Sequence, residues 1–128
     1  MINNKILTIC IPTYNRPKKL NNQLRVLLPQ LNDEIKLVVR DNHSNYNIKK
    51  LFPGLDYDKF EYIINDKNIG ADANIARCLE TCDTKWLWIL GDDDLIKNNT
   101  VLTILNLLKS NADCCYINMQ AKIERKVT

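Results

Sequence analysis

Short apolar runs alternate along the chain with longer segments in which apolar residues recur every three or four positions. The apolar runs predict five β-strands, at residues 7–11, 35–39, 60–64, 86–90 and 114–119. We expect the first strand to be buried on both faces, because its residues are nearly all apolar. We also expect Pro12 to end this strand, since proline lacks the amide hydrogen that a central strand uses.

The longer segments predict helices between the strands. The first helix begins at Pro17, and its apolar face is formed by Leu20, Leu24, Leu27, Leu28 and Leu31, with Pro29 disturbing the last turn. A short helix is expected near residues 48–52. The helix after Gly70 is expected to bury a face made of Ile75, Cys78, Leu79 and Cys82. The helix at residues 100–109 is expected to bury Val101, Ile104, Leu105 and Leu108.

The alternation of strands and helices indicates an α/β fold class. Parallel neighbouring strands need crossover connections, and right-handed crossovers place the helices on the faces of the sheet. We therefore expect a layered, Rossmann-like domain with a mainly parallel central sheet flanked by helices. The chain of 128 residues has the size of one domain, which we place at residues 1–128.

The composition is typical of a globular protein, with 45% hydrophobic and 26% charged residues. The net charge of +3 is spread along the chain, so nucleic acid is not an expected partner. We expect a cytoplasmic location, since no targeting signal or membrane span is recognisable, and peripheral attachment to the inner face of a membrane stays open. Five cysteines without Cys-x-x-Cys spacing and a single histidine favour reduced thiols over a zinc site.

Three consecutive carboxylates, Asp92, Asp93 and Asp94, follow the fourth apolar run after a single glycine. Unpaired carboxylates are too costly for a sheet core, so we expect them at the strand end, where Gly91 lets the chain turn. Adjacent anions repel one another unless a cation neutralises them, and hard oxygen ligands suit Mg²⁺ or Mn²⁺ shared with substrate phosphates. The alternative is a solvated acidic turn that caps the next helix.

Polar groups also follow the other predicted strands. Residues 12–16 follow the first strand, Asp41 and Asn42 the second, and residues 68–74 the third. Parallel α/β sheets bind ligands where the carboxyl ends of their strands meet. Tyr14 offers an apolar surface for a nucleobase, and Asp41 offers an acceptor for a base N–H. The alternatives are a tyrosine packed at the sheet edge and an aspartate that caps the following turn.

Residues 7–16, LTICIPTYNR, resemble the opening of the family 2 glycosyltransferases, which are inverting enzymes with the GT-A fold. Asp41 resembles the family's base-binding aspartate, and Asn68-x-Gly70-x-x-x-Asn74 resembles its third block. Residues 86–94 resemble the strand that ends in the family's metal-binding acidic motif, of the DxD type. The blocks occur in the family's order, which is more specific than any one of them.

This resemblance implies a glycosyltransferase that transfers a sugar from a nucleoside-diphosphate sugar to a glycan or lipid-linked acceptor. It also implies Mn²⁺ or Mg²⁺ as the cofactor and favours a UDP-sugar as the donor. It implies that Thr13, Tyr14 and Asp41 surround the nucleoside. The full set of implied nucleotide-sugar-binding residues is Pro12, Thr13, Tyr14, Arg16, Asp41, Asn68, Gly70, Asn74 and Asp92. Asp92 would lie near the ribose, and the implied metal ligands are Asp93 and Asp94.

The chain departs from the family pattern at Gly91, where aspartate is commoner, at Asn42, where a second aspartate is frequent, and at Ala73. The resemblance places the general base and the acceptor site after the acidic motif, so we expect the catalytic base beyond residue 128 and interpret the chain as the donor-binding portion. We expect an exposed sheet edge that favours self-association. A nucleotidyltransferase, which would normally carry a glycine-rich loop after the first strand, and a non-catalytic interaction module are the alternatives.

Overall fold

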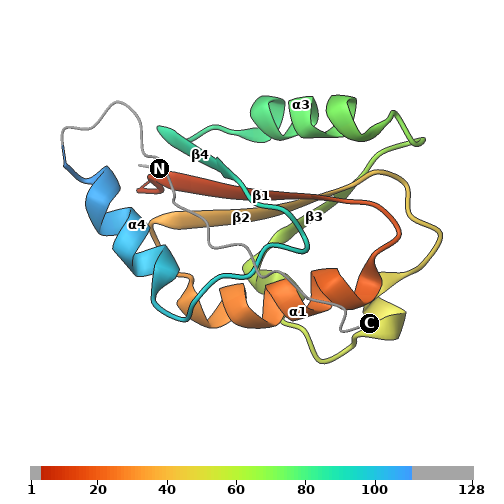
Figure 1. Ribbon diagram of the computed structural model, residues 1–128, viewed down its shortest axis with the longest axis horizontal. Coiled ribbons are helices and arrows are strands. Elements are labelled where there is room, and N and C mark those ends of the chain that lie inside the picture. The colour runs from red at the N-terminus through yellow and green to blue at the C-terminus, as the bar shows by residue number, and fades with distance from the viewer. Residues whose placement is uncertain (1–3, 111–128) are drawn as a thin grey trace, which may run out of the picture.

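The computed structural model describes residues 4–110, which form three layers (Figure 1). The middle layer is a sheet of four parallel strands in the order β3-β2-β1-β4. The strands are β1 (Leu7–Thr13), β2 (Ile35–Asp41), β3 (Glu61–Ile64) and β4 (Trp86–Ile89). The parallel α/β fold class expected from the sequence is confirmed, and the predicted strand at residues 114–119 lies outside the described residues.

The helices cover both faces of the sheet (Figure 1). Helix α3 (Ala71–Thr81) lies on one face, and α1 (Pro17–Leu27) and α4 (Thr100–Leu108) lie on the other. The shorter elements are α2 (Ile48–Leu51) and two 3-10 helices, η1 (Leu28–Gln30) and η2 (Tyr57–Lys59). Among the residues described, no helix has the length and apolar character needed to cross a membrane.

The main core lies between the sheet and the helices α1 and α4. The predicted face of α4 is confirmed, because its buried residues are Val101, Ile104, Leu105 and Leu108. In α1, Leu20, Leu24 and Leu27 are fully buried, as their spacing predicts, and η1 begins where Pro29 disturbs the helix. Full burial of one leucine contributes roughly 1.5–3 kcal/mol, so these two helices are held chiefly by their apolar faces.

The predicted face of α3 is confirmed at Cys78 and wrong at Ile75 and Leu79. Only Asn74 and Cys78 of this helix are buried, whereas Ile75 is 41% exposed and Leu79 is 63% exposed. The core beneath α3 is small, consisting of Cys10, Val38 and Cys78. The two buried residues have partners: Asn74 accepts from Asn65 Nδ2 and donates to Arg40 O, and Cys78 packs against Cys10 and Val38. Cys10, Cys78 and Cys82 are free thiols, as expected, while the other two cysteines lie outside the described range.

Strand β1 continues past Pro12 to Thr13, so the expected end at this proline is also wrong. Residues of β1 with even numbers direct their backbone groups toward β4, as the bond from Leu90 N to Cys10 O at 3.0 Å shows. The pairing with β4 stops at Cys10, while the pairing with β2 continues to Thr13. Pro12 therefore lies where a missing amide hydrogen costs no ladder bond.

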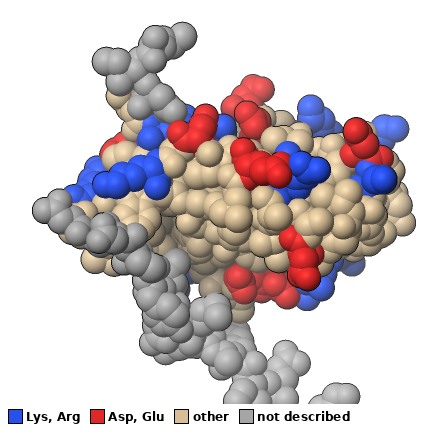
Figure 2. All heavy atoms as spheres, turned by 90° about the horizontal axis from the view of Figure 1, so that it is seen from above, with Lys and Arg blue, Asp and Glu red and all other residues tan. Residues whose placement is uncertain are grey.

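The face covered by α3 carries acidic and basic side chains that are interspersed (Figure 2). Ion pairs such as Arg77 with Glu80 at 2.6 Å belong to this mixed surface. A mixed surface of this kind has no single sign that would attract a polyanion.

Candidate functional site

The register of the sheet brings the ends of three strands together. Thr13 pairs with Asp41 across β1 and β2, and the backbone N of Asn42 donates to Thr13 O at 2.9 Å. On the other side of β1, the pairing with β4 ends at Cys10 and Ile89, just before the acidic segment. Thr13 therefore lies between Asp41, the last residue of β2, and the carboxylates that follow β4.

The acidic segment faces the start of the loop after β1. Thr13 Oγ1 donates to Asp92 Oδ2 at 2.8 Å, and Arg16 Nη1 lies 3.4 Å from Asp92 Oδ1 and 3.3 Å from Asp93 Oδ2. Asp92 is only 7% exposed, while the side chain of Asp93 is 50% exposed. One guanidinium thus contacts two neighbouring carboxylates, one buried and one open to solvent.

The acidic segment lies at the strand end, as expected, but the structure buries one of its carboxylates there. Asp92 tolerates burial because a hydroxyl and a guanidinium donate to it, which offsets much of the cost of removing its charge from water. Helix α4 begins only at Thr100 and has no acidic residue in its first turn. The alternative interpretation as an acidic turn that caps the next helix is therefore wrong.

Residues 91–94 form a closed turn. Asp94 N donates to Gly91 O at 3.3 Å, and Gly91 N donates to Asp94 Oδ2 at 3.0 Å. A Cβ at Gly91 would lie 2.8 Å from Asp94 Oδ2 and 3.2 Å from Asp93 Oδ1. The glycine that departs from the family pattern thus leaves room for two carboxylates to fold over the turn.

Among residues 4–110, no three histidine, cysteine or carboxylate side chains converge into a closed metal cage. Mg²⁺ is usually bound by one or two carboxylates together with substrate phosphates. Oxygens of Asp93 and Asp94 lie 3.2 and 2.8 Å from the position that a Cβ at Gly91 would occupy, and Arg16 places a positive charge against Asp92 and Asp93. The donor set and its open arrangement fit a hard divalent cation that is shared with a phosphate ligand.

Asp41 is buried at the end of β2, with 2% exposure. Its Oδ1 accepts from Ser44 N at 2.8 Å. Asp41 therefore does cap the following turn, as the alternative interpretation predicts. Its Oδ2 accepts from the hydroxyl of Tyr62. Burial, together with this bond, raises the pKa of Tyr62 above its usual value, which keeps the hydroxyl protonated as the donor. A carboxylate has about four acceptor positions, so both contacts leave capacity for a further donor.

Tyr14 is 43% exposed, so it is not packed away at the sheet edge. The next residue, Asn15, has a φ of 51°, and it connects the loops that follow β1 and β2. Asn15 N donates to Ser44 Oγ at 2.9 Å, and Asn45 N donates to Asn15 Oδ1 at 2.9 Å. These contacts join the loop that carries Tyr14 to the loop after β2, while Pro12 is half-buried.

The third block belongs to a separate network of asparagines. Asn74, which is 2% exposed, accepts from Asn65 Nδ2 at 2.8 Å and donates to Arg40 O at 3.0 Å. Asn68 Oδ1 accepts from Asn42 Nδ2 at 2.8 Å and from Gly70 N at 2.9 Å.

This network ties the start of α3 to the ends of β2 and β3. Within the described part of the chain, no hydrogen bond joins Asn68, Gly70 or Asn74 to the acidic turn. Asn42 and Asn65 are buried members that the sequence argument gave no role, although both stand directly at strand ends.

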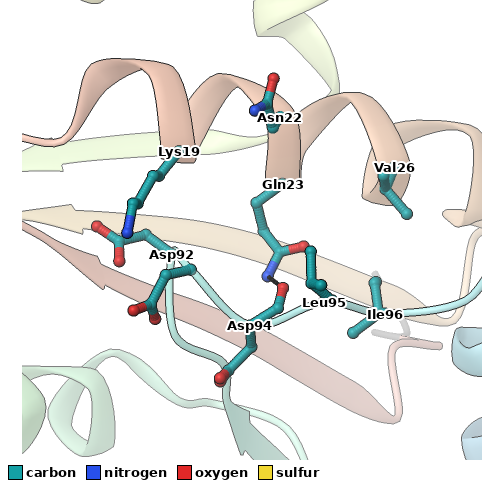
Figure 3. A pocket seen from close by; sticks show the side chains of 9 residues that line it. Lys19, Asn22, Gln23, Val26, Asp92, Asp94, Leu95 and Ile96 are labelled. Carbon is teal, nitrogen blue, oxygen red and sulfur yellow. Dashed lines mark hydrogen bonds between the residues drawn. The ribbon is translucent and has the colours of Figure 1, made fainter. Parts of the chain in front are cut away.

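A cleft of about 230 Å³ lies between α1 and the acidic turn (Figure 3). Lys19 and Gln23 point from α1 toward the turn. Gln23, only 4% exposed, donates to Gly91 O at 2.9 Å and to Asp94 O at 2.6 Å. The sequence analysis did not predict a role for Gln23. The pattern that could have indicated one is a polar residue beside Leu24, on the helix face that packs against the core.

The profile of glycosyl transferase family 2 matches residues 8–127. The chain belongs to this family. This family 2 chain is 28% identical over 116 residues to abequosyltransferase RfbV of Salmonella typhimurium, covering 84% of the chain and 34% of that protein. It is 23% identical over 123 residues to GalNAc(5)-diNAcBac-PP-undecaprenol beta-1,3-glucosyltransferase of Campylobacter jejuni, covering 94% of the chain and 39% of that protein. The chain therefore spans little more than a third of the length of these relatives.

Solved structures share the fold. TarS 1-349 of S. aureus in complex with UDP superposes with a TM-score of 0.69 and 19% identity, over 81% of the chain and 32% of TarS. The mannosyltransferase PcManGT of Pyrobaculum calidifontis, in complex with GDP-Man and Mn²⁺, superposes with a TM-score of 0.65 and 17% identity, over 82% of the chain and 32% of PcManGT. The predicted family and the GT-A architecture are confirmed.

Proposed function

We propose that this family 2 chain binds a nucleoside-diphosphate sugar and supplies the donor-binding half of a glycosyltransferase that acts on a glycan or lipid-linked acceptor. One observation carries the proposal: Thr13 connects the end of β2 with a buried carboxylate, Asp92, whose neighbour Asp93 is open to solvent. This arrangement offers fixed acceptors for ribose hydroxyls and an accessible anion for a cation within one site.

Asp93 is the proposed principal metal ligand. One oxygen of Asp94 already closes the turn on Gly91 N, so Asp94 has less freedom to serve as the second ligand. A bound Mn²⁺ or Mg²⁺ would supply positive charge against the diphosphate that leaves the sugar. Arg16 contacts the same carboxylates and is exposed enough to turn toward a phosphate.

Asp41 and Tyr14 are the proposed base-binding residues. The two contacts already made by Asp41 hold its carboxylate in one orientation. A fixed acceptor of this kind favours selective binding of a base with an N–H donor, such as uracil. Tyr14 directly follows Thr13, which pairs with Asp41, and its exposed ring can stack on the base. We propose UDP as the nucleotide on this basis. Asn68, Gly70 and Asn74 support the site indirectly, because their network holds Asn42 directly after Asp41.

The relatives support the class of reaction, since the names of both describe sugar transfer. Two solved structures of the same fold were determined with UDP and with GDP-Man and Mn²⁺. A nucleotidyltransferase is disfavoured by the family match and by the lack of glycine in residues 12–17, between β1 and α1. The catalytic base and the acceptor site are proposed to lie outside the described residues.

Calorimetry of the purified chain with UDP, GDP, CDP and ADP, each with and without Mn²⁺, tests the proposal. We expect one nucleotide to bind more tightly than the others and only when Mn²⁺ is present. Binding that is absent, or that is equal for all four nucleotides with and without the metal, would refute a metal-dependent donor site.

A further inference from the structure

Helix α1 holds the acidic turn through one buried side chain. The Nε2 group of Gln23 donates to Gly91 O and to Asp94 O, the first and last residues of the turn, at 2.9 and 2.6 Å. Because a primary amide carries two N–H donors, one side chain can serve both carbonyls at once. We propose that Gln23 is a positioning residue that sets the geometry of the acidic turn for its metal and diphosphate ligands. This inference rests on the proposed function.

The turn is fixed at the same two residues from two sides. The Asp94 carboxylate closes it internally on Gly91 N at 3.0 Å, and Gln23 closes it from the helix. The two residues between these ends, Asp92 and Asp93, then have little backbone freedom. Substitution of a group that holds a metal ligand in place typically lowers metal affinity about 10- to 100-fold.

The identity of the residue supports a positioning role. Gln23 lies on the face of α1 that also carries Leu20, Leu24 and Leu27, each fully buried. A leucine there would contribute hydrophobic burial without desolvating an amide, whereas a buried glutamine is tolerated only where its donors are satisfied. The two donors are used on the backbone of the acidic turn and not within the helix.

Gln30, the last residue of η1, is a matched control that contacts the same loop. It donates to Lys97 O at 3.3 Å and accepts from Val101 N at 3.2 Å, so it holds the far end of the segment that runs from the acidic turn to α4. Gln23 and Gln30 are seven positions apart, which is close to two helical turns. Both side chains hydrogen-bond the backbone of one loop, at opposite ends, and of the two it is Gln23 that contacts the acidic turn, while Gln30 also donates to Val26 O at 2.9 Å.

The test compares Q23M and Q30M, which replace each amide by an apolar chain of similar length. Hydrogen exchange of the metal-free protein is measured at the amides of Gly91 and Asp94 and at that of Val101. Calorimetry then gives the affinity for UDP in the presence of Mn²⁺, and thermal unfolding gives the loss of stability. Q23N, which keeps the amide but shortens its reach by one methylene, replaces Q23M if that variant does not fold.

We expect Q23M to accelerate exchange at the acidic turn and to weaken Mn²⁺-dependent UDP binding on the order of 10- to 100-fold, the range typical for residues that support metal ligands. Q30M should accelerate exchange at Val101 and leave UDP binding unchanged, although both variants lower the melting temperature. Unchanged exchange at Gly91 and Asp94 in Q23M, or equal weakening of UDP binding in both variants, would overturn the positioning role. A wild-type chain that binds no nucleotide would instead refute the proposed function, and the exchange measurement would still judge the role of Gln23.

Discussion

The hydrogen bond between Thr13 and Asp92 can be tested by removing a single hydroxyl. Thr13→Val replaces the Oγ1 atom by a methyl group of similar size, so the packing around this 4% exposed residue changes little. The variant removes the donor that lies 2.8 Å from Asp92 Oδ2. Asp92 is 7% exposed and, among its contacts with residues 4–110, then keeps only the longer one with Arg16 at 3.4 Å.

The expected cost follows from the charge and the burial of the acceptor. Hydrogen bonds to charged groups contribute about 1.5–3 kcal/mol, compared with roughly 0.5–1.5 kcal/mol for neutral pairs. Little water can replace the lost donor at a carboxylate that is nearly buried. We therefore expect Thr13→Val to lower the free energy of unfolding by about 1.5–3 kcal/mol.

Urea unfolding of the wild type and the variant at neutral pH measures this difference. Thr13→Ser is the control, because it keeps the hydroxyl and loses one methyl group worth about 0.8 kcal/mol. In an Asp92→Asn background, the cost of Thr13→Val should fall toward the value for a neutral pair, since the acceptor no longer carries a charge. Two results would contradict a stabilising bond between the hydroxyl and the carboxylate. In the first, Thr13→Val lowers the free energy of unfolding no more than Thr13→Ser does. In the second, Thr13→Val lowers it by the same amount in the wild type and in the Asp92→Asn background.

Three further predictions concern the neighbouring residues. Asp93→Asn should change the free energy of unfolding by less than about 1 kcal/mol, because the ion pair of Asp93 is exposed. It should weaken Mn²⁺-dependent UDP binding by at least the roughly 10- to 100-fold expected for a supporting residue. Calorimetry measures the binding and thermal unfolding the stability, and a strongly destabilised variant with intact binding would show a structural carboxylate. Asp41→Ala should flatten the preference among UDP, GDP, CDP and ADP while the Mn²⁺ requirement persists, and an unchanged preference in competition binding would leave Asp41 as a turn residue only. Burial raises the pKa of Tyr62 above its ordinary 10.0, so above pH 10 the folded state keeps a proton that the unfolded state loses, and the free energy of unfolding should fall as the pH rises. Tyr62→Phe should make this fall shallower when unfolding curves are measured at several pH values. An unchanged dependence on pH would contradict the raised pKa of Tyr62.

The elements whose stability is dominated by burial were predictable from the sequence. The face of α4 agrees with its spacing, and the leucines of α1 lie in the core, because a helix buries whichever stripe is apolar when nothing polar competes. The alternation of strands and helices was also sufficient to predict the parallel sheet, and the order of the strand-end motifs was sufficient to predict the family. These features depend on local patterns, which a sequence contains in full.

The tertiary structure decided the features that depend on partners distant in the chain. The buried face of α3 contains Asn74, which donates to Arg40 O across 34 positions, while Ile75 and Leu79 of the same helix stay exposed. The ladder beyond Pro12 depends on where β4 stops pairing, and the burial of Asp92 depends on a hydroxyl 79 positions away. Gln23 acquires its role only when α1 packs beside the acidic turn. Whether a polar side chain is buried depends on a hydrogen-bond partner, and here that partner is distant in the sequence and is brought into reach only by folding.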